Sequence, residues 1–304
     1  MNPSDSGDGA DRQDRQDSGE DGGDPPFGDD QGGSWDPGAN NGDSEADKGD
    51  PWDTETDRGN HPGYAVAGAV GAAIGGIVAA FLVTSVTGLG ISLLGVSIPT
   101  VSQFGIIFIA GAVGLAGTGV SYLAIRGLEV RSYVRMRVPS LSDVGWAVGG
   151  YFTALSLIFL AGLVLTMLQV RPETTNRAAQ AGMENPELLL WMVPLSFLVI
   201  APAEEFLFRG VIQGRLREAF TPLVAIPATA AIFATVHFFS LTGGSGARMI
   251  VIAILFLPSL VFGYAYERTT NLVVPIFIHG AYNATLVALV YVSMKVIEQG
   301  PLPA

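Results

Sequence analysis

Six polar side chains stand in otherwise apolar surroundings in the second half of the chain: Glu204, Glu205, Arg209, His237, His279 and Asn283. Ionisable side chains inside long apolar segments are costly, and by default they mark a functional site. Imidazole and carboxylate groups can bind a metal ion or position a water molecule, while an amide can stabilise an oxyanion. The set therefore predicts a buried site that activates water or holds a metal ion.

The two adjacent glutamates are expected to do different jobs. Glu205 and Arg209 are four residues apart, so they share a helix face and can form an ion pair. Glu204 points about 100° away around the same helix and stays free for another role. A purely structural ion pair would account for Glu205 and Arg209. It would not account for Glu204, because an ionised carboxylate in lipid is unfavourable unless it is paired.

Two of the three histidines of the chain lie well inside apolar segments. A lone buried histidine is usually structural, but His237 and His279 stand in the same set as the glutamates. His279 and Asn283 are four residues apart and occupy one helix face. At about 1.5 Å per residue, both histidines and Glu204 reach a similar depth if the helix of Glu204 continues to about Arg215. We expect them to meet near the middle of the membrane, with water entering from the inner side.

Seven apolar stretches are long enough to cross a membrane, which takes about 20 apolar residues in a helix. Some of them are apolar on every side, which disfavours a soluble helical core with polar faces. We therefore expect an all-α polytopic integral membrane protein with about seven transmembrane helices. The expected spans are 64–90, 101–125, 143–168, 188–208, 222–240, 249–266 and 272–294.

Residues 1–62 form an acidic segment with eighteen Asp or Glu against four Lys or Arg. Few of its residues are apolar, so it cannot bury enough surface to offset the entropy of an ordered chain. We expect a disordered acidic tail over 1–62 and a transmembrane helical domain over 63–304. The acidic composition suggests a halophilic prokaryote. The absence of cysteine excludes thiolate metal sites and cysteine nucleophiles.

Positive charge in short loops predicts which helix ends face the cytoplasm. Eight basic residues fall in or beside one set of expected loops: Arg126, Arg131, Arg135, Arg137, Arg209, Arg215, Arg217 and Arg268. Four fall in the other set: Arg171, Arg177, Arg248 and Lys295. This asymmetry favours an integral protein of the plasma membrane with its N-terminus in the cytoplasm and its C-terminus outside.

The polar residues of the second half resemble the motifs of the CPBP family of intramembrane proteases. That family includes the CAAX prenyl endopeptidases and bacteriocin-processing or immunity proteins, and its motifs read EExxxR, FxxxH and HxxxN/D. The matching residues here are Glu204-Glu205 with Arg209, Phe233 with His237, and His279 with Asn283. The resemblance covers approximately 188–290, with the motifs in the family's order.

The resemblance implies an intramembrane endopeptidase of the glutamate or metallo type. Such an enzyme cleaves a peptide bond of a membrane-associated substrate with water activated by a glutamate. By resemblance, Glu204 is the general base, while Glu205 and Arg209 hold the geometry of the site.

The same resemblance assigns roles to the remaining motif residues. His237 and His279 would support the water or, together with Glu204, bind a divalent metal such as zinc. Asn283 would stabilise the oxyanion. The expected partners are the lipid bilayer and a membrane-associated protein or peptide, including a prenylated one, with no nucleic acid.

Other classes of membrane protein fit the sequence less well. Aspartyl intramembrane proteolysis needs two Asp within spans, and Asp143 is the only Asp after residue 62. A rhomboid-like serine protease would use Ser245 within a Gly-rich stretch that reads as a connecting loop. The HExxH pattern of zinc peptidases is absent. The main alternative is a non-proteolytic scaffold or immunity-type protein that keeps the family fold, and a transporter is less favoured.

Overall fold

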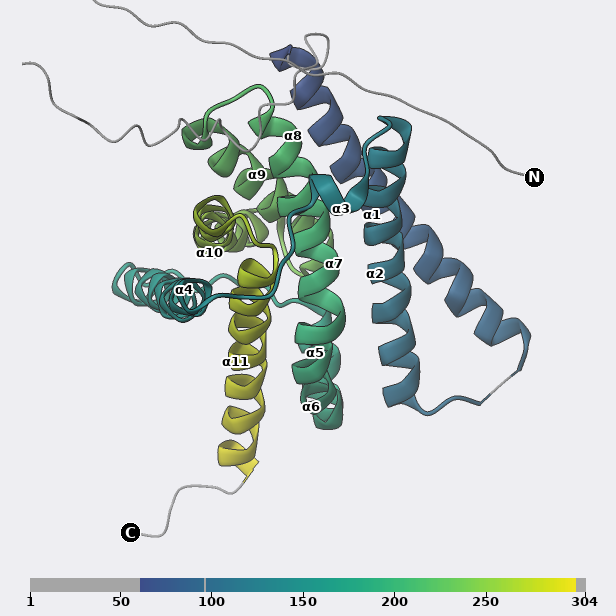
Figure 1. Ribbon diagram of the computed structural model, residues 1–304. Coiled ribbons are helices and arrows are strands. Elements are labelled where there is room, and N and C mark those ends of the chain that lie inside the picture. Colours follow the sequence, from purple (N-terminus) through teal and green to yellow (C-terminus); the bar gives the residue numbers. More distant parts are fainter. Residues whose placement is uncertain (1–60, 96, 299–304) are drawn as a thin grey trace, which may run out of the picture. The chain divides into compact units, whose positions relative to one another are not determined.

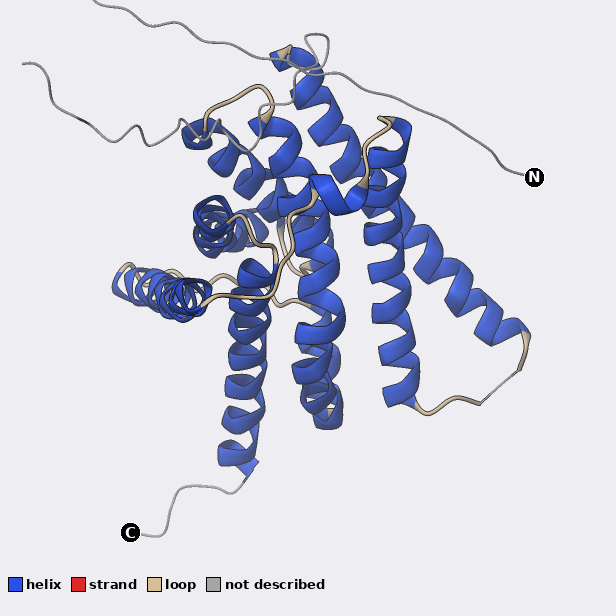
Figure 2. Ribbon diagram, viewed as in Figure 1, coloured by secondary structure: helices blue, strands red, loops and turns tan. Residues whose placement is uncertain are grey.

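The structure is a computed structural model that describes residues 61–95 and 97–298. Its regular elements within those ranges are all helices (Figure 2), and the one β-bridge there joins Asn176 to Leu241. The acidic segment lies almost wholly outside the described residues, so its expected disorder and the division at residue 62 stay predictions.

Seven described helical segments are long and apolar enough to cross a membrane. They confirm the expected all-α membrane fold, with each boundary within a few residues of its expected position except the end of the fourth span. The short helices α3 (Val130–Tyr133) and α5 (Arg177–Glu184) lie between spans. The spans are α1 (Pro62–Leu93), α2 (Thr100–Ile125), α4 (Leu141–Met167), the fourth span (Pro186–Arg217), α9 (Pro222–Val236) with η3 (His237–Ser240), α10 (Ser245–Thr269) and α11 (Val273–Glu298).

The fourth span is longer than expected and is irregular. It continues to Arg217, which satisfies the condition for Glu204 to reach the depth of the histidines. Two of its five parts are π-helical, a wider turn that often occurs at functional sites. Its parts are α6 (Pro186–Leu195), η1 (Ser196–Ile200), α7 (Ala201–Glu205), η2 (Phe206–Gln213) and α8 (Gly214–Arg217).

Small residues let α1 and α2 pack closely. Figure 1 shows these two helices on the right of the view. A Cβ atom on Gly114 would lie 2.5 Å from backbone atoms of Ala80. In lipid, where apolar side chains gain little by leaving the solvent, close backbone approach supplies much of the packing energy. Gly114 therefore fixes the distance between the first two spans.

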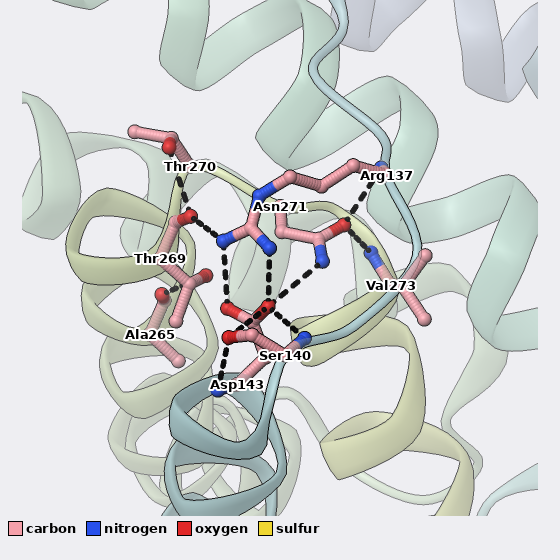
Figure 3. A network of polar contacts seen from close by, with 8 residues as sticks. All are labelled: Arg137, Ser140, Asp143, Ala265, Thr269, Thr270, Asn271 and Val273. Carbon is pink, nitrogen blue, oxygen red and sulfur yellow. Dashed lines mark hydrogen bonds and ion pairs between the residues drawn. The ribbon is translucent and has the colours of Figure 1, made fainter.

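A polar network joins the start of α4 to the turn between α10 and α11 (Figure 3). Arg137 donates to both carboxylate oxygens of Asp143, at 2.6 and 3.0 Å, and to the carbonyl of Thr269. The side chain of Asn271 accepts from the backbone N–H of Arg137 at 3.2 Å. Ser140 and Asp143 also form a capping box at the start of α4. The network thus anchors three helix ends at one point.

A second network surrounds the buried carboxylate of Glu218, just beyond the fourth span. Arg126 binds it with two hydrogen bonds, at 2.7 and 2.9 Å, the Tyr133 hydroxyl donates at 2.6 Å, and Arg215 forms an ion pair with it. Burial alone would raise the pKa of Glu218, but the hydrogen bonds from Arg126 and Tyr133 and the charges of Arg126 and Arg215 outweigh it and lower that pKa. The ionised carboxylate therefore ties the ends of α2 and α8 together.

Replacing Gly114 with alanine tests the close approach of α1 and α2. We expect Gly114→Ala to lower the stability of the detergent-solubilised protein by about 1–3 kcal/mol, because the new methyl group overlaps the backbone of α1. Gly117→Ala on the same helix is the control, since a Cβ there meets nothing within 4 Å. That control should leave stability unchanged or raise it by up to about 1 kcal/mol. Equal melting temperatures for the two variants would contradict the packing described.

The Glu218 network predicts loss of stability in acid. A carboxylate whose folded pKa lies below its unfolded value of about 4.3 stabilises the protein above that pH. This contribution is lost as the pH falls through the lower, folded pKa. We expect the melting temperature to drop below about pH 4.3. Glu218→Gln should be less stable at neutral pH by about 3–5 kcal/mol and should lose this part of the pH dependence. An unchanged acid profile in Glu218→Gln would contradict the assignment.

Candidate active site

Three spans bring the six candidate residues together. Glu204, Glu205 and Arg209 lie on α7 and η2, His237 begins η3 at the end of α9, and His279 and Asn283 lie on α11. A cavity of about 630 Å³ is bordered by four of them: Glu204, His237, His279 and Asn283. Glu205 and Arg209 lie behind its wall and are fully buried. The structure thus places all six in one region, in two layers.

The buried layer is built around Arg209. Its guanidinium donates from Nη1 to Glu205 Oε1 at 3.0 Å, which confirms the expected ion pair. Its Nη2 donates to the hydroxyl of Ser259 at 2.7 Å and to the Ser259 carbonyl at 3.2 Å. Both charged side chains are completely excluded from solvent. The charge of Arg209 is therefore compensated by two helices.

Two aromatic rings complete the surroundings of this guanidinium. Its central carbon lies 4.6 Å from the ring centre of Phe233 and 5.3 Å from that of Phe262. The His279 ring stacks on Phe262, with centres 4.9 Å apart, and meets Phe233 edge-on. Aromatic faces attract cations, so both rings favour the charged arginine and fix the imidazole plane.

Sequence reasoning did not identify Ser259 and Phe262 as parts of the site. A polar residue in the middle of an apolar span was the available signal for Ser259. Phe262 offered no such signal, because aromatic residues are ordinary in transmembrane helices.

His279 connects the buried layer to the cavity. Its Nδ1 lies 2.7 Å from Glu205 Oε1. An ionised carboxylate can only accept, so Nδ1 carries the proton of this hydrogen bond. Its other nitrogen, Nε2, lies 3.8 Å from Glu204 Oε2. That distance is too long for a direct hydrogen bond, yet one water molecule can contact both atoms.

Glu204 and Glu205 are adjacent in sequence and stand in different environments. The side chain of Glu205 is buried, whereas that of Glu204 is 19% exposed and borders the cavity. Within the described ranges, one carboxylate oxygen of each glutamate has no hydrogen-bond partner, and of the two side chains only that of Glu204 borders the cavity. A carboxylate that borders a cavity and has no arginine partner can accept a proton, which is what a general base requires.

His237 and Asn283 face the same cavity from other helices. His237 Nδ1 lies 2.7 Å from the carbonyl oxygen of Phe233, so Nδ1 donates to it and the neutral ring leaves Nε2 as an acceptor. Asn283 lies one turn beyond His279 on α11. Both side chains are therefore available to a group that enters the cavity.

A comparison with family models identifies the part of the chain that holds this geometry. Residues 186–285 match the family described as type II CAAX prenyl endopeptidase, Rce1-like. This segment belongs to that family. The Rce1-like segment contains all six candidate residues, and the match confirms the resemblance to CAAX-type intramembrane proteases. No curated protein and no solved structure gives a significant match to the chain.

The Rce1-like segment contains the three predicted metal ligands, Glu204, His237 and His279. Across residues 61–95 and 97–298, no group of three or more His, Cys, Asp or Glu side chains is placed to hold a metal ion. His279 Nδ1 is bound to Glu205 and His237 Nδ1 to the carbonyl of Phe233, which leaves the Nε2 atom of each ring as a potential ligand. Zinc binding by Glu204, His237 and His279 stays a prediction, which metal analysis of the purified protein would test.

The residues that border the cavity bear on the rhomboid-like alternative and on the expected route of water. Ser245, the residue required by a rhomboid-like mechanism, is exposed at the start of α10 and is not among the residues that border the cavity. The cavity extends from Glu204 toward the loops at Thr174 and Ser240. Those loops lie at the opposite helix ends from the main cluster of arginines, and the expected entry of water from the inner side stays a prediction.

Removing either partner of the buried ion pair should destabilise the Rce1-like segment. Glu205→Gln leaves Arg209 uncompensated, which typically costs about 3–5 kcal/mol. Arg209→Lys should also be destabilising, because an ammonium cannot reproduce the guanidinium fork between Glu205 and Ser259. Thermal unfolding in detergent is the measurement, and Arg171→Lys on an exposed loop is the control. Melting temperatures that match the wild type would show that the pair is dispensable.

Proposed function

We propose that this chain is an intramembrane endopeptidase in which Glu204 activates the attacking water. One observation carries the proposal: of two adjacent glutamates in the fourth span, Glu205 is fully buried and paired with Arg209, whereas Glu204 borders the cavity. A protein that needed only a structural ion pair would not need Glu204. The family match supports protease activity for the segment that contains both residues.

In the proposed reaction, a water molecule sits between Glu204 Oε2 and His279 Nε2. Glu204 accepts a proton from this water as its oxygen attacks the carbonyl carbon of the scissile peptide bond. The carbonyl π electrons move to the oxygen, and a tetrahedral oxyanion forms. Protonated Glu204 then gives the proton to the leaving nitrogen as the C–N bond breaks, which returns the carboxylate to its starting state.

His279 and the buried pair act as positioning groups in this scheme. The hydrogen bond from His279 Nδ1 to Glu205 fixes the imidazole tautomer and keeps Nε2 as an acceptor for the water. Arg209 holds Glu205 in place. These groups are ordered before substrate arrives, so their orientation costs nothing during the reaction.

We assign stabilisation of the oxyanion to Asn283, whose amide can donate a hydrogen bond to it from the cavity wall. His237 supports the substrate or the water from the end of α9. In a site shielded from bulk water, each such polar group has a larger effect than it would in solution.

We propose a membrane-associated peptide as the substrate. The cavity wall is largely apolar, with Phe104, Phe108, Leu255 and Val287 among its residues, so it suits a prenyl chain or an apolar peptide segment. We also propose location in the plasma membrane of a halophilic prokaryote with a cytoplasmic N-terminus. The acidic N-terminal composition and the distribution of arginines support this location.

Glu204→Gln is the direct test of the catalytic assignment. The amide keeps the size of the side chain but cannot accept the proton, so we expect turnover to fall by about 10²–10⁴-fold. Cells that carry this variant should accumulate uncut membrane precursors, which can then be assayed with the purified enzyme in liposomes. The melting temperature should stay near that of the wild type, unlike that of Glu205→Gln. Near-normal turnover by Glu204→Gln would favour the non-proteolytic scaffold.

A further inference from the structure

We propose that a groove between α4 and α10 binds an anionic phospholipid, with one lipid chain in the groove and the phosphate on Arg268. The two helices pack against each other at the left of Figure 1. None of the residues that line the groove borders the cavity of the candidate active site. The proposal therefore rests neither on peptide cleavage nor on which helix ends face the cytoplasm.

Small residues on one face of α4 make room for the groove. Gly145, Gly149 and Thr153 follow one another at intervals of four residues, so they share a helix face, and all three are exposed. A Cβ atom on either glycine would meet nothing within 4 Å. The groove has a volume of about 760 Å³, which lies within the range of roughly 300–1,000 Å³ that is usual for ligand pockets. Its wall on α10 consists of Leu260, Val261, Tyr264 and Ala265.

The length and polarity of the groove suit a lipid chain. Its residues on α4 run from Ser142 to Thr153, a rise of about 16 Å along the helix. Two leaflets share a hydrocarbon core about 30 Å thick, so the chain of one lipid reaches about 15 Å. No residue that lines the groove is charged. A lipid chain of ordinary length therefore fits along the whole groove.

One end of the groove carries a positive charge. Arg268 follows Tyr264 by one turn of α10, and its guanidinium carbon lies 5.7 Å from the ring centre of Trp146 and 6.0 Å from that of Tyr264. The two rings meet edge-on, with centres 5.8 Å apart. Aromatic rings attract a cation through their faces, and the N–H groups at the edge of the guanidinium stay available as donors. The rings thus hold Arg268 beside the groove.

Arg268 differs from its neighbours at this end of the helices, which we call the arginine-rich end. It is exposed and, within the described part of the chain, forms no ion pair or hydrogen bond. The indole N–H of Trp146 and the hydroxyl of Ser142 likewise lack a hydrogen-bond partner there. Three other arginines at this end each bind a carboxylate: Arg126, Arg137 and Arg217. The end of the groove therefore offers a charge and several donors with no acceptor.

A phospholipid supplies what both parts of the groove lack. Its phosphate accepts hydrogen bonds from a guanidinium fork and from neutral donors, while its chain covers the apolar wall. Basic pockets between transmembrane helices bind anionic head groups, and Trp and Tyr gather at the level of those groups. A helix of a second copy would also pack on the small residues of α4. Helix packing alone would not compensate the charge of Arg268.

Titration of the purified full chain with phospholipid in mixed micelles tests the site. The melting temperature is measured as the mole fraction of phosphatidylglycerol rises and, separately, as that of phosphatidylcholine with the same chains rises. A ligand that binds only the folded protein raises the melting temperature with its occupancy. We expect half-maximal stabilisation at a mole fraction of phosphatidylglycerol at least tenfold lower than that of phosphatidylcholine. Equal values for the two lipids would overturn the proposal.

Arg268→Gln tests the role of the charge. This variant should need about tenfold more phosphatidylglycerol for half-maximal stabilisation, which brings it close to the value for phosphatidylcholine. Arg248→Gln is the matched control, because Arg248 lies near the other end of α10 and its guanidinium carbon is also close to an aromatic ring, 5.0 Å from the centre of Phe238. The control should keep the preference of the wild type. A preference retained in Arg268→Gln, or lost equally in both variants, would overturn the assignment of the phosphate.

Gly149→Leu tests the role of the groove. The new side chain occupies the space of the lipid chain, so we expect both lipids to bind at least tenfold more weakly. Gly162→Leu is the control on the same helix, since Gly162 is also exposed, a Cβ there meets nothing within 4 Å, and it does not line the groove. Unchanged lipid titrations in Gly149→Leu would overturn the groove as the lipid site. If a dimer of the wild type also dissociated in that variant, the groove would belong to a second copy.

Discussion

The requirement to compensate Arg209 shapes the interior of this membrane protein. A guanidinium with no exposed surface cannot rely on water, so protein groups must replace its hydration. Glu205 supplies the countercharge from the same helix, Ser259 supplies acceptors from α10, and aromatic faces approach from α9 and α10. Glu205 also binds His279 of α11. The helices that carry the chemistry are therefore brought into register by one buried charge.

Polar interactions are unevenly distributed along the helices. The networks around Glu218 and Asp143 join helix ends at the arginine-rich end. At the other end, the hydrogen bonds between loops join Thr174 and Thr175 to Thr242. The cavity lies on this less constrained side. Tight anchoring at one end and a wide cavity at the other are thus two aspects of the same arrangement.

Much of this architecture was accessible from the sequence. Lipid forces the backbone into helices, so hydropathy alone located seven spans, and the spacing of Glu205 and Arg209 predicted their pairing. The partnership of Ser259 and Phe262 with Arg209 depends on how distant helices cross, which no local pattern encodes. Counting residues along each helix predicted that the candidate residues lie at a similar depth. It did not predict toward which helix ends the cavity extends.

The segment that matches the family begins at residue 186, but the environment of the site begins earlier in the chain. Phe104 and Phe108 of α2 complete the cavity wall, and Arg137 with Asp143 holds α4 against the turn at Asn271. A fragment restricted to the matched residues would keep every candidate catalytic group and lose part of the enclosure around them. The segment that carries the catalytic groups is therefore smaller than the part of the chain that must fold around them. A chimera that exchanges the matched segment between related proteins would also have to keep the contacts of that segment with α2 and α4.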